Sequence, residues 1–583
     1  MTADPRLRWI ALGSAVAALL IRVPFAARRM WDHDSIQFAL GVERYDLAAH
    51  HPHPPGYPLY IGILKLLAAL GLDPLHGMVA LAILGGALGA ACIVLLTGRA
   101  GTLTPPAPLS HPHSHPPGRG GRQIFAWLGR ASRRAFPPLP GGGSADGRGG
   151  QGVRVPAAAF AGVLYAFNPL LWFYGELPLI YALEGGLSVA VAYGALRMSE
   201  SRRAFLLACA LMAVAGGLRQ STLVLLAPLF LFGLFRTWRR GRLTPSLFFG
   251  GAALGVALVL AWFVPLCLLA GGYGAYRRIS TAHFGTLLPQ TSVLYGAGWG
   301  ALAHNVEVLT KWALQGIFPG AVALLLVWAT APRQVLPGLR LLASRLSWLL
   351  AWALPPVLFF ALFHITKAGY TLIHLPALLT ALALAAAPAL AASRPRALAA
   401  TAVAAMVGAG LFLFGADRRP DQPKPWAIVR HEFNQGTIAE YELGLDRTLE
   451  AIRSWSPADT VLAAVELSGT GGSGAEGFLC PWQRHLQWYL PEYPLVFLVP
   501  EQGFAEATQA HRPFQRVQGT IELPAATRRI VFVLSGLPGN RLALPLGEVR
   551  RTGEDFYVLA VPFSGAMKVG PLTLTAQRAR KAA

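Results

Sequence analysis

Residues 9–27 read Trp-Ile-Ala-Leu-Gly-Ser-Ala-Val-Ala-Ala-Leu-Leu-Ile-Arg-Val-Pro-Phe-Ala-Ala, an apolar stretch interrupted by Arg22 and Pro24 near its end. A helix of about 20 apolar residues is long enough to span the hydrocarbon core of a bilayer. The stretch lacks the small-residue cleavage pattern of a secretory signal, so we interpret it as a retained transmembrane helix. Similar apolar runs recur as far as residue 415, which predicts a polytopic α-helical membrane protein.

The composition agrees with this class. Of the 583 residues, 54% are hydrophobic and 13% are charged, whereas soluble domains contain about 25% charged residues. The four cysteines show no disulfide framework and no CxxC metal pattern. About eleven crossings are expected, at residues 9–27, 77–97, 155–173, 177–196, 204–218, 221–236, 246–270, 309–329, 347–365, 369–388 and 398–415.

Positive charge is concentrated between the apolar segments. The net charge is +22, but acidic and basic residues nearly balance after residue 416. Because Lys- and Arg-rich loops stay in the cytoplasm, this placement indicates membrane orientation and not nucleic-acid binding. The basic loops are Arg6/Arg8 and residues 98–154, 197–203, 236–242, 333–345 and 394–396. In the plasma (inner) membrane the N-terminus would then be cytoplasmic, and the outer side would carry residues 28–76, 174–176, 219–220, 271–308, 366–368 and the C-terminal domain.

Residues 57–71 form a shorter apolar run with Lys65 at its centre. About 15 residues are too few to span a bilayer without tilt, which takes about 20. We interpret the run as a juxtamembrane or re-entrant helix on the outer face. A short true crossing is the alternative, and it would invert the side of every later loop.

The chain divides into a membrane domain, residues 1–416, and a C-terminal domain, residues 417–583. Within the first, residues 98–154 are rich in Pro, Gly, Arg and His and are expected to form a disordered cytoplasmic insert. Apolar runs in the tail, such as Ile530-Val-Phe-Val-Leu, predict buried strands in a small extracytoplasmic α/β or α+β domain. The tail sequence has no GxGxxG and no P-loop, so nothing in it indicates a nucleotide site.

Two polar motifs follow the first apolar segment. The first reads Trp31-Asp32-His33-Asp34-Ser35-Ile36-Gln37-Phe38, and the second reads His53-Pro54-Pro55-Gly56-Tyr57-Pro58-Leu59-Tyr60. Carboxylates at a membrane rim can take a proton from an acceptor or hold a metal ion. Asp34 is therefore our candidate base, with the alternative that it caps a helix at the membrane surface. The two prolines of the second motif fix an extended entry, and Gly56 permits the turn that follows.

Together the two motifs resemble the bacterial branch of the GT-C glycosyltransferase superfamily that is similar to protein O-mannosyltransferases. The resemblance covers roughly residues 1–420 and implies sugar transfer from a polyprenyl-phosphate carrier on the outer side of the membrane. In that family Asp-Ser-Gly-Glu-Phe follows the first helix, and the segment Asp34-Ser-Ile-Gln-Phe38 keeps its Asp, Ser and Phe. Gln37 replaces the second carboxylate, which puts a two-acid mechanism in doubt unless Asp32 substitutes for it. Residues 53–60, which we call the hook, are expected to shape the floor of the site.

A second acid is expected at the outer end of the third crossing. In the family an acid closely precedes Tyr-Ala-Leu, and here Tyr181-Ala-Leu is kept while Leu179 stands in place of the acid. Glu176 lies about one helical turn earlier on the same face. Because an unpaired Glu within a membrane is costly, we favour a functional role for Glu176, with Glu184 as the other candidate.

Polar residues at outward loop ends are candidates for binding the carrier phosphate. Arg219 and Gln220 interrupt an apolar run at its outward bend. The forked guanidinium of Arg219 suits phosphate, although an Arg at this depth can instead extend to the lipid headgroups. The remaining substrate-binding candidates are Gln37, His53, Tyr57, His283, Lys367 and Tyr370.

These observations predict a membrane glycosyltransferase that moves a sugar from a polyprenyl-phosphate carrier to an extracytoplasmic protein, lipid or glycan. Asp34 would be the base or would orient the acceptor, Glu176 would assist through a divalent cation or by holding a sugar hydroxyl, and other residues would neutralise the phosphate. Arg219 and Lys367 are expected in that last role. A transporter or flippase of lipid-linked sugars is one alternative, for which two halves with matching broken helices are expected. A non-catalytic envelope-glycan assembly protein is the other, and Gln37 favours it.

Overall fold

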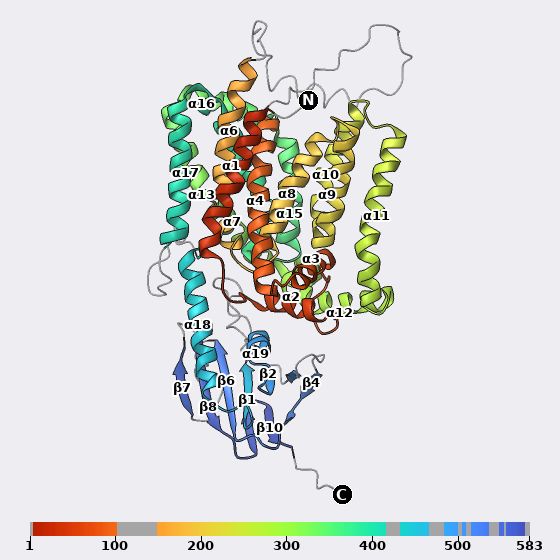
Figure 1. Ribbon diagram of the computed structural model, residues 1–583, viewed down its shortest axis with the longest axis vertical. Helices are drawn as coiled ribbons and strands as arrows, with labels where there is room; N and C mark the ends of the chain where they lie inside the picture. The colour runs from red at the N-terminus through yellow and green to blue at the C-terminus, as the bar shows by residue number, and fades with distance from the viewer. Residues whose placement is uncertain are drawn as a thin grey trace.

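The computed structural model describes residues 4–101, 148–415, 432–465, 483–499, 504–508, 515–535, 547–552 and 556–577. Figure 1 shows a bundle of long helices with a smaller, sheet-containing domain at one end. Most of the predicted insert at residues 98–154, and the proposed domain boundary at 416–417, lie outside the described residues.

The bundle consists of long helices joined by shorter ones. The long helices are α1 (Pro5–Arg22), α4 (Pro74–Ala100), α6 (Arg148–Ala166), α8 (Tyr181–Arg197), α9 (Arg202–Leu218), α10 (Ser221–Arg239), α11 (Pro245–Leu269), α13 (Gly298–Thr330), α15 (Leu346–Leu362), α16 (Leu375–Ala392) and α17 (Arg394–Phe414). The shorter ones are η1 (Val23–Phe25), α2 (His33–Glu43), α3 (Pro58–Ala69), α7 (Pro169–Tyr174), α12 (Tyr273–Thr291), η2 (Val293–Tyr295), η3 (Pro332–Gln334), α14 (Val335–Ala343) and η4 (Ala368–Ile373). Five of the long helices, α1, α4, α9, α11 and α17, begin with an Asp, Ser or Thr cap followed by a proline or an arginine; Asp73, for example, accepts the amide of His76, and Thr244 accepts that of Leu247.

Among the described residues, seven helical spans are long and apolar enough to cross a membrane, and the bent pair Pro332–Ala343 and Leu346–Leu362 would make eight. The predicted polytopic helical class is therefore confirmed, whereas the predicted number of about eleven crossings is not. Two expected crossings, α8 and α9, have only 17 residues each. The crossing expected at 155–173 is divided at Asn168, whose side chain accepts the amides of Leu170 and Leu171 and so starts α7.

The basic loops lie together at one end of the bundle. Arg99, at the end of α4, pairs with Glu200 of the α8–α9 loop at 2.5 Å. Arg345, before α15, donates to the carbonyl oxygen of Ala100 at 2.8 Å. This clustering is what loops on one side of a membrane require; that this side is the cytoplasm remains a prediction.

The opposite end of the bundle carries α2, α3 and α12 (Figure 1). Helix α3 has 12 residues, fewer than the roughly 20 of an untilted crossing. Lys65 on α3 donates to the carbonyl oxygen of Val42 at 2.6 Å, and this bond satisfies an acceptor at the end of α2. The interpretation of residues 57–71 as a re-entrant helix remains a prediction.

The C-terminal region contains helices and strands, as predicted. One sheet has the order β4-β3-β2-β1-β6-β8-β7, with β1 parallel to both neighbours, and a second has the order β5-β10-β9. Buried on both faces, β1 packs on one side against α18 (Gln435–Arg453) and α19 (Gln483–Tyr489) and on the other against the second sheet. The strands are β1 (Thr460–Val465), β2 (Leu495–Val499), β3 (Phe504–Thr508), β4 (Gln515–Gln518), β5 (Thr520–Leu523), β6 (Arg529–Ser535), β7 (Glu548–Arg551), β8 (Phe556–Pro562), β9 (Ala566–Val569) and β10 (Leu572–Ala576).

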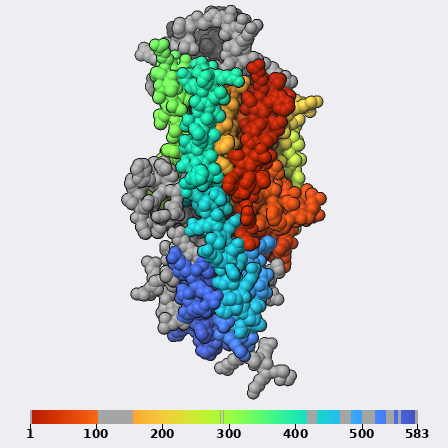
Figure 2. Space-filling view, turned by 60° about the vertical axis from the view of Figure 1, so that its left-hand side comes forward, coloured from red at the N-terminus to blue at the C-terminus, as the bar shows by residue number. Residues whose placement is uncertain are grey.

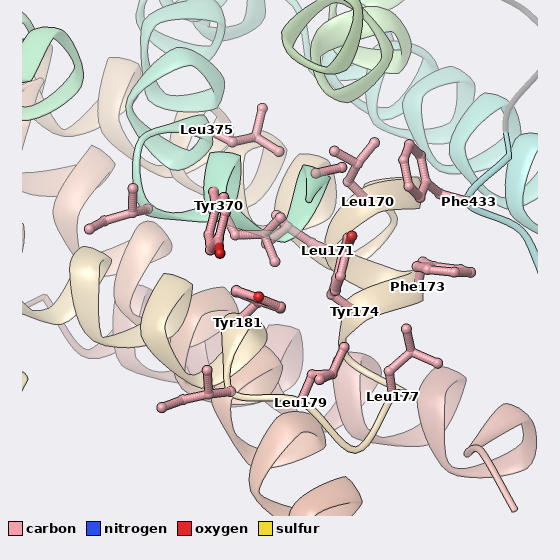
Figure 3. Packing of buried hydrophobic residues seen from close by; sticks show 14 of the residues in the cluster. Leu170, Leu171, Phe173, Tyr174, Leu177, Leu179, Tyr181, Tyr370, Leu375 and Phe433 are labelled. Atoms are coloured by element: carbon pink, nitrogen blue, oxygen red, sulfur yellow. The ribbon is translucent and has the colours of Figure 1, made fainter. Parts of the chain in front are cut away.

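Buried aromatic side chains join the bundle to this domain. Phe173 and Tyr174 of α7 contact Phe433, with ring centroids 5.4 and 6.1 Å apart (Figure 3). The ring of Trp31 lies 4.4 Å from that of Tyr441 on α18. Because all five side chains are buried in one apolar cluster, the domain is packed against the end of the bundle. Figure 2 shows the elongated molecule that results.

Candidate functional site

A cavity of about 730 Å³ opens at the end of the bundle that carries α2, α3 and α12. Nine predicted site residues line it: Asp34, Gln37, His53, Tyr57, Arg219, Gln220, His283, Lys367 and Tyr370. Asp32 lies beside it, bonded to Lys367. Glu176 is not among the described residues that line it. The fold thus gathers most of the candidates from segments far apart in the chain.

The first turn of α2 separates the roles of the two aspartates. Asp32 is the N-cap: its side chain accepts the amide of Ser35 at 3.1 Å, and the Ser35 hydroxyl donates to the carbonyl oxygen of Asp32 at 2.7 Å. The alternative that Asp34 caps this helix is therefore wrong, because Asp32 fills that position. Asp34 lies inside the first turn with its carboxylate lining the cavity.

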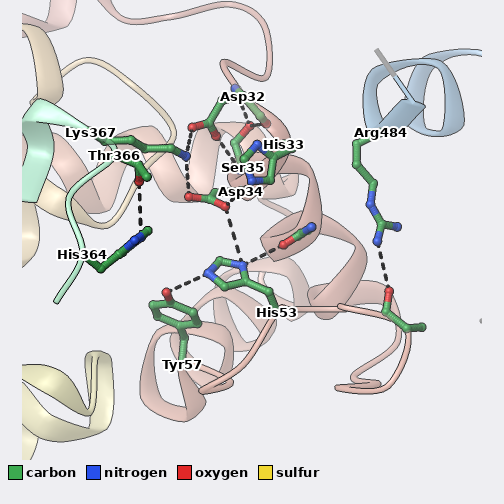
Figure 4. A network of polar contacts seen from close by, with 12 residues as sticks. Asp32, His33, Asp34, Ser35, His53, Tyr57, His364, Thr366, Lys367 and Arg484 are labelled. Carbon is green, nitrogen blue, oxygen red and sulfur yellow. Dashed lines mark hydrogen bonds and ion pairs between the residues drawn. The ribbon is translucent and has the colours of Figure 1, made fainter. Parts of the chain in front are cut away.

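Lys367 bridges the two aspartates (Figure 4). Its ammonium group donates to Oδ2 of Asp32 and, at 2.6 Å, to Oδ2 of Asp34. All three side chains are buried. Burial alone would raise the pKa of Asp34, but the positive charge of Lys367, with smaller contributions from the neighbouring His33 and His53 rings, outweighs it and holds that pKa below its ordinary value. Asp34 is therefore ionised at neutral pH, and Lys367, which we expected to face a phosphate, is engaged by carboxylates.

His53 anchors the hook to α2. Its Nδ1 lies 2.7 Å from Oε1 of Gln37, and its Nε2 lies 2.8 Å from the hydroxyl of Tyr57. Since an amide oxygen only accepts, Nδ1 carries the proton and Nε2 accepts the Tyr57 hydroxyl. Burial lowers the pKa of His53 to about 3, although Asp34, 3.7 Å from Nδ1, acts in the opposite sense. Gln37, which stands at the position where the resembled family has a carboxylate, therefore orients the neutral imidazole of His53.

Close packing sets the shape of the hook. A Cβ at Gly41 would lie 2.9 Å from the ring of Pro52, so α2 touches the residue just before the hook at a point where only glycine fits. Gly56 has φ of +105°, a conformation that favours glycine, and its carbonyl oxygen accepts the Tyr45 hydroxyl at 2.7 Å. Tyr57 follows with φ of +49° and starts α3. The predicted turn at Gly56 is present.

Arg219 lines the cavity but already has an anionic partner. It donates to Oε2 of Glu184 at 3.0 Å, and Oε1 of Glu184 accepts the hydroxyl of Thr222 at 2.5 Å. Its guanidinium also lies 4.5 Å from the centre of the Tyr370 ring. An arginine that reaches only to lipid headgroups does not make such contacts. Gln220, the next residue, donates to the carbonyl oxygen of Pro55 at 3.2 Å and so ties α10 to the hook.

Glu184, and not the favoured Glu176, is the glutamate that contacts a residue of the cavity wall. Glu176 is fully buried in the loop between α7 and α8, where its carbonyl oxygen accepts the amide of Ala27 at 3.0 Å. A Cβ on the neighbouring Gly175 would lie 2.5 Å from Nε of Arg22, so this loop packs against the end of α1 and away from the cavity. Glu184, the second choice from sequence, is the acid that reaches Arg219. A turn after α7, which the apolar pattern did not reveal, accounts for the difference.

The cavity has a polar floor and an apolar wall. Two wall histidines were not predicted: His33, whose Nε2 lies 3.1 Å from Oδ1 of Asp34, and His364. His33 is adjacent to Asp34 and His364 lies three residues before Lys367, and this nearness was the available signal. The apolar wall consists of Val224, Phe284, Leu287, Leu288, Phe359 and Phe363. Within the described part of the chain, no group of three or more His, Cys, Asp or Glu side chains is arranged to hold a metal ion.

Residues 45–242 match a family model described as the Protein O-mannosyl-transferase TMEM260 N-terminal domain. This segment includes the hook, Glu184 and Arg219, and it begins after Asp34. The predicted similarity to protein O-mannosyltransferases is therefore confirmed over this part of the chain.

Comparisons with individual proteins add less. No curated protein sequence matches the chain. Two solved structures of ArnT from Cupriavidus metallidurans, one in the apo state and one bound to undecaprenyl phosphate, are 14% identical to it with a TM-score of 0.49. Each comparison covers 95% of this chain and 97% of the ArnT chain. Likeness at this level carries no argument about function.

Proposed function

We propose that this protein transfers a sugar from a polyprenyl-phosphate carrier to an acceptor hydroxyl on the outer side of the membrane. The observation that carries the proposal is the ionised Asp34 on the cavity wall, held by a lysine that can change partners. A base for the acceptor and a cation for the leaving phosphate are thereby within one hydrogen bond of each other. Sugar transfer from a lipid phosphate needs both groups.

The two kinds of cavity wall suit the two parts of such a donor. The polyprenyl chain lies along the apolar residues of α12 and α15, such as Leu288 and Phe359, and the phosphate lies at the polar end near Arg219 and Lys367. Apolar walls with a few convergent polar groups are typical of ligand sites. Arg219 contributes a forked donor set to the phosphate while Glu184 holds its side chain in place.

Asp34 accepts the proton of the acceptor hydroxyl. The acceptor O–H bond breaks as its oxygen bonds to the anomeric carbon of the sugar, and the bond from that carbon to the phosphate oxygen breaks with its electron pair. The phosphate gains a negative charge in this step, so Lys367 transfers a hydrogen bond from Asp34 to a phosphate oxygen. Losing this cation makes Asp34 more basic as the proton arrives. Asp32 keeps Lys367 in place throughout.

One observation also favours the non-catalytic alternative. Gln37 replaces the family's second carboxylate, and its amide oxygen is occupied by His53. A protein that had lost activity could keep this cavity as a binding site. The transporter alternative has less support, because the polar side chains of the cavity lie at one end of the bundle.

The test is incubation of the purified protein with a panel of radiolabelled polyprenyl-phosphate sugars and candidate acceptors. We expect release of the free polyprenyl phosphate with at least one donor, and none with an Asp34→Asn variant. Binding of a donor without release of its carrier by the wild-type protein would favour the assembly protein. Movement of an intact donor across a vesicle membrane would favour the flippase.

A further inference from the structure

A buried arginine of the C-terminal domain reaches the loop that leads into the hook. Arg484 on α19 is only 4% exposed. It donates to the carbonyl oxygen of Ala49 at 3.2 Å (Figure 4). Its Nη1 lies 3.3 Å from Nε2 of His51. Gln487, one turn later on α19, accepts a third hydrogen bond at 2.9 Å and orients the guanidinium. Burying an arginine is costly unless its donors are satisfied, so these bonds are a specific feature of the interface.

The loop that Arg484 contacts is a small closed unit. Asp46 and His51 exchange two backbone hydrogen bonds of 2.7 and 2.8 Å, and the Asp46 side chain accepts the amides of Ala48 and Ala49. Arg484 therefore adds two bonds to this unit from the C-terminal domain, at a backbone oxygen and a ring nitrogen. Without Arg484 the loop would lose both of these bonds.

From this loop the contacts lead directly to the cavity. Pro52 follows His51 and packs against Gly41 on α2, where a Cβ would already be too close. His53 follows Pro52 and bonds to Gln37 and Tyr57, both of which line the cavity. A shift of the loop at His51 would therefore move His53 relative to α2, the helix that carries Asp34.

Two other polar contacts between the domain and the bundle lie outside this loop. Arg29 pairs with Asp446 at 2.7 Å, with both side chains more than 40% exposed, and Met30 donates its amide to the hydroxyl of Tyr489 at 2.8 Å. These bonds attach the domain to the segment before α2, which does not include the hook. Arg29 therefore offers a matched control at the same interface.

We propose that Arg484 is a positioning residue for the site: through Ala49 and His51 it holds the hook so that His53 stays against α2. The C-terminal domain is then a structural part of the catalytic cavity. This inference rests on the proposed function for its catalytic consequence, but the geometric part stands independently. An arginine that only attaches the domain would affect the whole interface and leave the hook unchanged.

Hydrogen exchange measures the geometric part without any substrate. In the full-length protein, Arg484→Gln should accelerate exchange of the hook-loop amides at least about tenfold, because a hydrogen bond from a charged group is lost. The amides to follow are those of Asp46, His50, His51 and Gly56, all hydrogen-bonded in the structure. Arg29→Gln should leave them unchanged. Unaltered exchange in a folded Arg484→Gln protein would overturn the proposal.

Two further variants guard against misfolding. His51→Leu removes an acceptor from the loop side and leaves the C-terminal domain intact, so it should accelerate the same amides even if Arg484→Gln does not fold. Arg484→Lys keeps the charge but lacks the fork, and it should restore part of the protection. If His51→Leu leaves every hook amide protected, the proposal fails.

Kinetics then test the catalytic consequence. With an identified donor, Arg484→Gln should lower kcat by about tenfold or more, while the donor KM should stay within about twofold, because Arg484 does not touch the donor. Arg484→Lys should recover part of kcat, and Arg29→Gln should match the wild type. An effect on donor KM alone would contradict a positioning role. Should no donor be turned over at all, the proposed function fails while the exchange result still decides the role of Arg484.

Discussion

At the scale of single residues, one ammonium group lies between the carboxylates of Asp32 and Asp34. Lys367 lowers the pKa of Asp34 and keeps its carboxylate ionised, so Asp34 becomes a stronger base only when this cation turns to another anion. Asp34 is the better base because it lines the cavity, whereas Asp32 also accepts the amide of Ser35. The helix cap therefore assigns one carboxylate to structure and leaves the other for chemistry.

Asp34→Asn should reduce sugar transfer by about 100-fold or more, since it removes the base and preserves the size of the side chain. The measurement is the steady-state rate of carrier release. Glu43→Gln is the matched control, because Glu43 is exposed at the end of the same helix, and it should retain full activity. A fully active Asp34→Asn protein would move the base to Asp32 or remove the enzyme hypothesis.

Lys367→Met should destabilise the protein, because it leaves Asp32 and Asp34 buried without their cation. Removing one partner of a buried pair costs roughly 3–5 kcal/mol, which thermal unfolding can detect. The pKa of Asp34, which Lys367 lowers against the effect of burial, should rise, so the acid limb of the pH–rate profile should move to higher pH. Combining the change with Asp32→Asn removes one carboxylate and should restore part of the stability. An unchanged unfolding midpoint in the single variant contradicts this account.

Arg219 tests the phosphate site separately from the base. Arg219→Gln should weaken binding of the polyprenyl-phosphate donor by about tenfold or more, and Arg219→Lys should recover only part of it, because one ammonium cannot replace the fork. Titrating the donor against the three proteins provides the affinities. Because Arg219 also bonds to Glu184, replacing Arg219 could weaken binding by disturbing the structure. Glu184→Gln, which breaks the same bond, is the control for this structural effect. Equal affinities across the series would exclude a phosphate role for Arg219.

At the scale of elements, the long apolar helices were predictable because their length and apolar composition match the thickness of the bilayer core. The division at Asn168 was not, since the Asn168 cap and Pro169 start a new helix, α7, inside an apolar run. Among the site residues, Asp34 and the hook were predicted from two short sequence motifs. The Lys367–Asp34 and Arg219–Glu184 pairs did not, because no local pattern relates residues that meet only after the bundle is packed. Charged residues in apolar runs indicate that partners exist but not which ones.

The hook also predicts a dependence of stability on pH. Burial lowers the pKa of His53 to about 3, whereas an imidazole in the unfolded chain has its ordinary pKa near 6.5. Between these values the unfolded state binds more protons, so stability is complete above pH 6.5 and decreases as the pH falls toward 3. Thermal midpoints near pH 7.5 and pH 5 should differ, and His53→Gln should reduce the difference. His76→Gln, at an exposed site, should not; an equal effect of both changes would argue against a buried neutral His53.

At the scale of the whole molecule, the basic loops and the cavity lie at opposite ends of the bundle. Arg99, Arg240 and Arg345 belong to one end, and the cavity and the C-terminal domain belong to the other. Basic loops remain in the cytoplasm, so this separation predicts that the cavity faces outside. A polyprenyl-phosphate donor in the outer leaflet could then enter the apolar wall from the bilayer, and a soluble acceptor could approach beside the domain.

Cysteine labelling of intact cells tests this orientation. After all four native cysteines are replaced by serine, a single cysteine is placed in turn at three exposed positions: Ala48 beside the hook, Glu450 on α18 and Arg333 at the basic end. A membrane-impermeant maleimide should label the first two in intact cells, and Arg333→Cys only after permeabilisation, because the basic loops are retained inside. A denatured sample of each variant controls for thiol reactivity. Labelling of Arg333→Cys from outside, with Ala48→Cys protected, would invert the molecule and place the cavity in the cytoplasm, where an outer-leaflet donor could not reach it. Labelling of Ala48→Cys and Glu450→Cys on opposite sides would contradict the packing of the domain against the hook.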